Sequence, residues 1–406
     1  MMQVSDEIYT EGCNFIRQYL VYALLSGRPV RIAQIRPMDD DPGIKGTEIK
    51  FQPGLLQGGE FELDCNGVVR CLSYFLEPLI LLAPFCKKPL RVTLKGATNA
   101  PSEVSVDAIR VTWLPVFDKF VLNAENLAIK RVKPGKIRKI RGLAYVCKVS
   151  PSMASRMIDA AKRTMRDYLA DVYITLDQRK GPSGGLSPGF GIFITAETTE
   201  GVFYHGEAMS NPRGVDADQR IPEELGVEAA NKLLNEIYRV RVAQPIEQRS
   251  GLNVGSRFKS CHGSHLFHLH NKLAIRRVKR HHLELRAAAR GSALSRYLAG
   301  KLVGGCLDTT AQPLAATFMT LCEKDVSKFL FGPLSRYTVQ TLRSLKLFFG
   351  HTFKIDELWR MEKREQDDDQ DNATAQKPSG QRLGSRDKAL MTSVGVGYFN
   401  INKNLL

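Results

Sequence analysis

The sequence predicts an α/β protein of the α+β type, in which helix-to-strand units repeat along the chain around a small inserted α/β domain. Three segments support the repeat, because each carries an apolar helix, a glycine or proline, and a short strand: 14–32, 70–95 and 335–355. The middle of the chain follows another pattern, a helix followed by strands. A length of 406 residues exceeds one ordinary core, so two or three folding units are expected.

The three repeats are predicted from the same local signals. In 14–32 an apolar stripe from Phe15 to Leu24 marks one helical face, Gly27 should end the helix, and the strand-like PVRI follows. In 70–95 an apolar helix leads into a segment in which apolar and polar residues alternate, which predicts a strand. In 335–355 Gly350 should end the helix before a short strand.

The inserted domain is expected at 142–215. Ser150 and Pro151 are typical of a helix start, and an apolar stripe from Ala154 to Leu169 leads into a strand at 172–176. Two further strands, 190–198 and 202–209, are joined by a short turn. We interpret this pattern as a small α-β-β module.

The other boundaries follow from pattern and composition. The large domain is predicted to comprise 1–141, 216–239 and 304–361, with a C-terminal strand segment at 389–406. The helix of 221–239 is assigned to it because its apolar positions are in register: Leu225, Ala229, Leu233 and Ile237. Residues 362–388 are polar and acidic, then rich in Gly, Ser and Lys, which predicts a disordered linker.

The charge is uneven along the chain. Lys and Arg outnumber Asp and Glu by 58 to 42, and a formal charge of +16 favours polyanionic partners such as RNA, DNA or an acidic membrane. Residues 240–303 hold 13 Lys or Arg against 2 acids, hence about +11, and six of the eight histidines. We expect this basic insertion to be disordered and dispensable for the fold.

The compartment is predicted from the cysteines and the N-terminus. Eight scattered cysteines without a CxxC pair favour free thiols in a reducing compartment. The N-terminus has no basic and apolar signal pattern, and the longest apolar run, 79–85, is far shorter than the ~20 residues of a membrane span. A soluble protein with no membrane partner is expected.

Two basic patches are candidate RNA contacts. Residues 130–141 hold seven basic side chains and no acid, among them Lys136, Arg138, Lys139 and Arg141. They either contact phosphates or form a solvated basic surface. Arg343 and Lys346 share a helical face that either grips RNA or an acidic partner or serves solubility. A metal site is not predicted, because the spacing of the candidate ligands fits no tight zinc pattern: Cys261, His262, His265, His268 and His270.

A series of motifs spans most of the chain outside 240–303. It includes NFIRQ near the N-terminus, QPGLLQGG at 52–59, PGKIRKIRGLAY at 134–145, SPGFGIFITAET at 187–198, GGCLDTT from 304 and DVSKFLFGPLSRYTV at 325–339. In this order the motifs resemble the RNA 3'-terminal phosphate cyclase family, and specifically its cyclase-like branch. The resemblance implies a large domain of repeated βαβ-type units with a small α/β insertion.

The resemblance also bears on catalysis. Active cyclases use a histidine that accepts AMP from ATP, within a His-x-x-Asp-Gln motif. The match places Asp308 at the aspartate, Thr309 at the glutamine and Gly305 at the histidine. Cys306 is expected to be structural, because its setting is apolar. We therefore expect no catalytic residue and no cofactor, while Arg17 and Arg28 are expected to line a remnant anion pocket.

The cyclase-like branch implies a role in ribosome assembly. We predict a non-catalytic factor of the small-subunit processome, located in the nucleus and nucleolus, that is needed for early cleavage of precursor ribosomal RNA. Its implied partners are a ribosome-assembly GTPase, the precursor RNA and a small nucleolar ribonucleoprotein. The alternative is an RNA-processing enzyme, either an endoribonuclease or a divergent cyclase. The missing histidine argues against cyclase chemistry and hardly at all against nuclease chemistry.

Overall fold

The computed structural model describes residues 7–36, 47–66, 70–100, 103–121, 136–166, 171–184, 188–211, 220–238, 305–357 and 388–398. The basic insertion 240–303 and residues 362–387 of the predicted linker lie outside this set, as does the cluster from Cys261 to His270. Among the described residues no helix is long and apolar enough to cross a membrane. The structure joins none of the seven described cysteines in a disulfide with another described cysteine.

The first predicted repeat is confirmed. Helix α1 (Ile16–Ser26) ends at Gly27, which takes a left-handed φ of 70° and donates its backbone N–H to the carbonyl of Ala23. Strand β2 (Val30–Ala33) follows, pairs in parallel with β1 (Ile8–Glu11), and pairs antiparallel with β3 (Ile49–Phe51). The unit is therefore a βαβ unit with one added strand.

The second and third repeats are also confirmed. Strands β4 (Gly59–Asp64) and β5 (Leu90–Lys95) pair in parallel, and α2 (Leu72–Leu82) lies between them in the sequence. The third sheet has the order β10 (Val326–Phe331), β12 (Ala389–Val394), β11 (Lys354–Glu357), with α9 (Arg336–Phe349) between β10 and β11 in the chain. Helix α9 begins after Ser335, whose Oγ accepts from the Thr338 N–H, and ends at Gly350.

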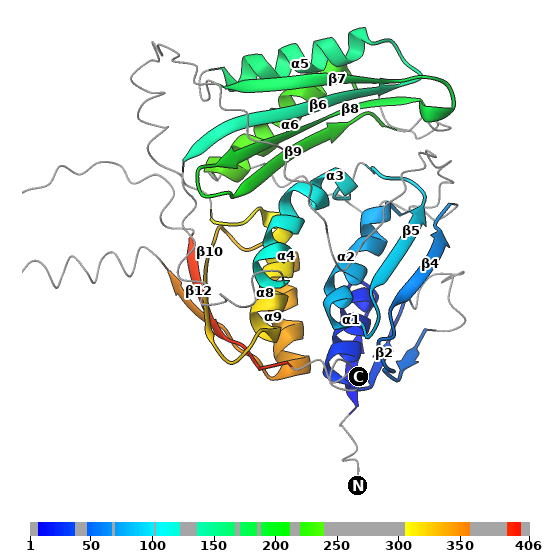
Figure 1. Cartoon of the computed structure of the whole chain (residues 1–406), viewed down its shortest axis with the longest axis vertical. Coiled ribbons are helices and arrows are strands. Elements are labelled where there is room, and N and C mark those ends of the chain that lie inside the picture. Colours follow the sequence, from blue (N-terminus) through cyan, green and yellow to red (C-terminus); the bar gives the residue numbers. More distant parts are fainter. Residues whose placement is uncertain are drawn as a thin grey trace, which may run out of the picture.

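The helices of the large domain lie between its sheets (Figure 1). One continuous helical segment packs beside α8 (Gln312–Leu321). It consists of α3 (Val106–Ala108), a π-helical stretch (Ile109–Trp113) and α4 (Leu114–Val121). In the shared core the Phe120 ring stacks on Phe318 and Phe329. Tyr22 is fully buried, and its hydroxyl bonds to Thr317 at 2.8 Å. The core therefore joins segments from both ends of the chain.

The small domain has its own sheet and core. Its strand order is β7 (Val172–Arg179), β6 (Ile137–Cys147), β8 (Gly189–Thr198), β9 (Phe203–Met209), with β6 and β7 parallel and the other pairs antiparallel. Helices α5 (Ser152–Met165) and α6 (Pro222–Tyr238) cover one face (Figure 1). A Cβ on Gly206 would lie 2.2 Å from the Ala229 carbonyl oxygen, so α6 approaches β9 closely only because this residue is glycine.

Two predicted boundaries are wrong. Helix α6, expected in the large domain, buries its whole apolar stripe in the small-domain core: Leu225, Ala229, Leu233 and Ile237 are fully buried there. Strand β6 begins at Ile137, so the basic residues of 136–141 also belong to the small domain. Periodicity shows that a helix has a buried face, and it does not show which sheet buries that face.

Candidate functional site between the two domains

A cavity of about 390 Å³ lies where the small domain meets the large one. Strands β8 and β9 and helix α6 line it on the small-domain side. The loop around 99–105 and the segment Asp308–Thr310 line it on the other side. Because both domains contribute polar side chains, the cavity is the candidate functional site.

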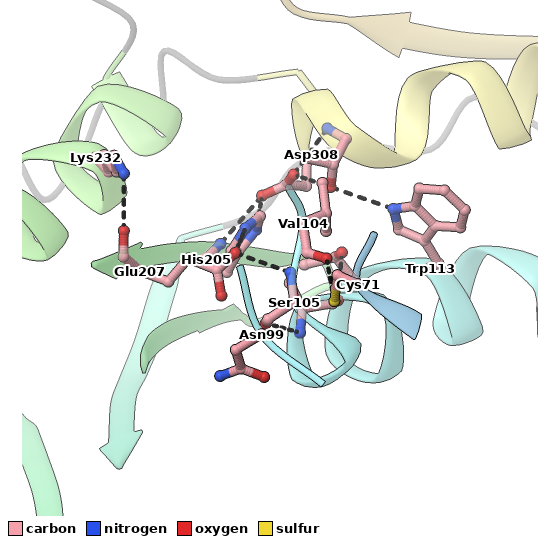
Figure 2. Close-up of polar contacts among 12 residues, drawn as sticks. Cys71, Asn99, Val104, Ser105, Trp113, His205, Glu207, Lys232 and Asp308 are labelled. Carbon is pink, nitrogen blue, oxygen red and sulfur yellow. Dashed lines mark hydrogen bonds and ion pairs between the residues drawn. The ribbon is translucent and has the colours of Figure 1, made fainter. Parts of the chain in front are cut away.

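A buried ion pair joins the domains at this cavity. Asp308 stands before the short 3₁₀ turn Thr309–Ala311, and its Oδ1 accepts from the Thr310 N–H at 2.9 Å and the Thr310 hydroxyl at 2.7 Å. Its Oδ2 accepts from the His205 backbone N–H at 3.1 Å and pairs with His205 Nδ1 at 2.8 Å (Figure 2). One carboxylate thus holds a strand of the small domain 103 positions away in the sequence.

The pair is ionised near neutral pH. Burial alone would lower the pKa of His205, but the Asp308 carboxylate outweighs burial and, with Glu207 and Glu236, raises that pKa to about 9. Burial likewise opposes ionisation of Asp308, but the imidazolium and the Thr310 hydrogen bonds hold the Asp308 pKa below its ordinary value. His205 is therefore an imidazolium without a free lone pair.

The second ring nitrogen of His205 faces a carboxylate. Its Nε2 lies 4.0 Å from Oε1 of Glu207, which accepts from the Ser105 N–H at 3.0 Å. The Phe193 ring stacks on the imidazole, with 6.0 Å between ring centroids. His205 can therefore donate a hydrogen bond, but it cannot serve as a nucleophile or general base while it is protonated.

Further carboxylates on α6 complete the cavity wall. Glu236 accepts from the Thr309 N–H at 3.2 Å and from the Thr309 hydroxyl. Lys232 donates to the Glu207 carbonyl oxygen at 2.9 Å and pairs with Glu228 at 2.8 Å. Five carboxylates line the cavity against three cationic groups: Glu103, Glu207, Glu228, Glu236 and Asp308 against His205, Arg220 and Lys232. This charge balance suits a neutral or cationic group better than a triphosphate.

The position expected to replace the cyclase histidine is a packing glycine. A Cβ on Gly305 would lie 2.2 Å from the Gly332 nitrogen and 2.6 Å from the Phe331 carbonyl carbon, so this backbone has no room for any side chain. The carbonyl oxygen of Gly305 accepts from the Tyr204 hydroxyl at 2.6 Å. Cys306 is buried in the small-domain core, as expected of a structural cysteine.

Arg17 and Arg28 lie at opposite ends of α1, and the structure does not bring them to one pocket. The Arg17 guanidinium pairs with Glu77, donates to the Tyr74 carbonyl oxygen, and lies 4.0 Å over the Tyr74 ring. Arg28 donates to the Leu347 carbonyl oxygen at 3.0 Å, near the end of α9. Arg17 therefore serves to hold α1 against α2, and in the part of the chain that the structure describes the two arginines do not line one shared pocket.

The basic residues of 136–141 are brought together on β6. Arg138 and Lys139 share Glu197, at 3.9 and 2.8 Å. Arg141 forms two hydrogen bonds of 3.1 Å with Asp171. The side chain of Lys136 is exposed just before the strand. On the large domain, Arg343 and Lys346 are exposed on α9, away from the buried Leu345.

Sequence reasoning missed His205, Glu207 and Glu236. The alternation of 203–209 places His205 and Glu207 on one strand face, which is a usable signal for a polar site. Their partner Asp308 is far away in the sequence, so only the fold reveals the pair. Among the residues that the structure describes, no group of three or more His, Cys, Asp or Glu is arranged to hold a metal ion.

The class of protein is defined by the similarity of its small domain to a known inserted domain. Residues 132–238 match the family model of the RNA 3'-terminal phosphate cyclase (RTC) insert domain, which coincides with the small domain seen here. The fold is thus that of a cyclase-like protein with its inserted domain.

Relatives over the full length then give the family. A cyclase-like protein of Caenorhabditis elegans is 41% identical over 99% of this chain and 100% of its own length. The RNA 3'-terminal phosphate cyclase-like protein of Homo sapiens is 35% identical over 97% of each chain. A Schizosaccharomyces pombe relative, named rRNA processing protein rcl1, is 29% identical over 97% of each. The chain belongs to the family of RNA 3'-terminal phosphate cyclase-like proteins.

Proposed function

We propose that this protein is a non-catalytic ribosome-biogenesis factor that acts in the processing of precursor ribosomal RNA. The observation that carries the proposal is its similarity, over nearly the whole chain, to a relative named as an rRNA processing protein. A formal charge of +16 and the basic residues of β6 support an RNA partner.

The proposal has finer parts. The protein works in the small-subunit processome, in the nucleus and nucleolus, and is needed for early cleavage of the precursor. It binds a ribosome-assembly GTPase and meets the precursor RNA with a small nucleolar ribonucleoprotein. Arg343 and Lys346, exposed on α9, are the proposed contact for the partner or the RNA.

Three features of the site support a non-catalytic role. Position 305 has no space for a side chain that could accept AMP. His205, the histidine beside the matched Asp308, is held as an imidazolium by that carboxylate, so its nitrogens have no lone pair for attack on phosphorus. The acidic balance of the cavity wall also disfavours a triphosphate.

The test is replacement of the Schizosaccharomyces pombe relative by this chain. We expect growth and normal levels of the early precursor RNA cleavage products, measured by RNA blotting, together with a nucleolar signal from a tagged copy. Accumulation of uncut precursor despite normal expression would contradict the role in processing. The purified chain incubated with α-labelled ATP should stay unlabelled, and acid-labile label on the protein would contradict the non-catalytic part.

A further inference from the structure

The small-domain sheet has a second face, opposite α5 and α6, on which side chains form two rows. The strand registers place Tyr173, Arg141, Thr195 and His205 side by side in one row across β7, β6, β8 and β9. The next row is Thr175, Leu143, Phe193 and Glu207. We call these two rows the open face.

The open face is exposed at one end and closed at the other. Tyr173 is 59% exposed, and Thr175 is also exposed. At the far end His205 and Glu207 line the interdomain cavity. A third row is closed because the Tyr145 ring lies over Gly191, where a Cβ would be 2.4 Å from the Tyr145 hydroxyl oxygen, and that hydroxyl accepts from Asn99 of the large domain.

The chemistry of the open face suits flat, partly charged ligands. The hydroxyls of Thr175 and Thr195 donate to carbonyl oxygens of β6, at 3.2 Å each. The protons of both hydroxyls are therefore directed to the sheet backbone. Tyr173, Leu143 and Phe193 supply an aromatic and aliphatic surface beside the charged His205 and Glu207 at the far end. The Arg141 guanidinium lies 6.0 Å from the Tyr173 ring centroid.

The rim of the open face is basic. Four cationic side chains flank it and Arg141 lies within it, against three neighbouring carboxylates: Lys136, Arg138, Lys139 and Arg179 with Arg141, against Asp171, Asp177 and Glu197. Two of the cations share the single carboxylate of Glu197. An anionic backbone laid along this rim would thus be attracted, while its attached rings reach the aromatic surface.

We infer that the open face is a platform for single-stranded RNA, with an unpaired base stacked on Tyr173. This inference rests on the proposed function for the source of the RNA, the ribosomal precursor. Duplex RNA buries its base faces and is recognised through its phosphates and 2'-hydroxyls, whereas an exposed tyrosine on a sheet presents a ring to unstacked bases. The open length, from Tyr173 to Phe193, spans three strands or roughly 10 Å, which accommodates about two bases.

The test is binding of the full chain to a fluorescently labelled decauridine, followed by anisotropy at several salt concentrations. Tyr173→Ala should weaken binding about tenfold, because stacking of one base on an aromatic ring contributes on that order. Tyr173→Phe keeps the ring and should stay within about twofold of the unaltered chain. Tyr9→Ala is the matched control, since Tyr9 is a strand tyrosine of similar exposure, 56%, on the large domain.

The outcomes separate this inference from the proposed function. If Tyr173→Ala binds decauridine as the unaltered chain does, or if the unaltered chain does not bind it, the platform is refuted, while rescue of precursor processing in the yeast replacement leaves the proposed function standing. If Tyr173→Ala loses as much affinity for a hairpin duplex as for decauridine, base stacking on Tyr173 would also be overturned. Photo-crosslinking with 4-thiouridine RNA should label a peptide containing Tyr173, and label confined to the large domain would contradict the inference.

Discussion

Two ion pairs link separate parts of this molecule, one within the large domain and one between the domains, and they differ in the cation. Within the large domain Arg17 of α1 pairs with Glu77 of α2, and their side chains are 22% and 10% exposed. Between the domains His205 pairs with Asp308, and their side chains are 9% and 0% exposed. Guanidinium stays charged at any ordinary pH, whereas imidazole can lose its proton. The Arg17–Glu77 contact between the helices is therefore insensitive to pH in the ordinary range. The junction between the domains, in contrast, depends on the proton of His205.

The largest expected effect is at the junction. Asp308→Ala removes the carboxylate that accepts from the backbone N–H and Nδ1 of His205 and from the N–H and hydroxyl of Thr310. We therefore expect a loss of about 3–5 kcal/mol in the free energy of unfolding. Urea denaturation measures it. Asp308→Asn keeps an oxygen for the turn and should cost less, and equal costs for both variants would mean that the charge does not matter.

The second prediction concerns pH. The folded-state pKa of His205, about 9, is above its ordinary value of 6.5, so its stabilising contribution is full below pH 6.5 and is lost as pH rises toward 9. The loss should be on the order of 3 kcal/mol, seen as a falling urea midpoint. His205→Gln should flatten this slope. Parallel curves for the two proteins would show that another group causes the dependence.

The Arg17 pair should give a smaller, pH-insensitive effect. Burial lowers the pKa of Arg17, but Glu77 outweighs burial and the pKa ends above its ordinary value. Glu77→Gln should cost about 1–3 kcal/mol, because the guanidinium loses its carboxylate but keeps the Tyr74 carbonyl oxygen and some contact with water. Between pH 6.5 and 9 this loss should stay constant. A loss that varies with pH would remove the contrast with His205.

The smallest effect is expected for the exposed pair on β6. Arg141 and Asp171 are 43% and 59% exposed, so water and salt screen their attraction. Asp171→Asn should change the free energy of unfolding by less than about 1 kcal/mol, measured by the same denaturation. A larger loss would show that double hydrogen bonding, rather than burial, sets the strength of these pairs.

The sequence by itself determined the local elements and the family. Gly27 and Gly350 end helices because they take left-handed φ values of 70° and 65°, a conformation that glycine adopts without strain. Alternation in 190–198 and 202–209 gave β8 and β9, because side chains alternate between the faces of a strand. The ordered motifs indicated the cyclase-like family, which the full-length relatives confirm.

Only the tertiary structure decided what these elements contact. The stripe from Leu225 to Ile237 was visible as a buried helical face, but its burial on β9 depends on the close approach at Gly206, which no periodicity reveals. Asp308 was visible as a motif residue, yet its partner His205 comes from a strand 103 positions away. Local pattern follows from backbone geometry over a few residues, whereas a buried charge is stabilised by whichever partner the fold brings within about 3 Å.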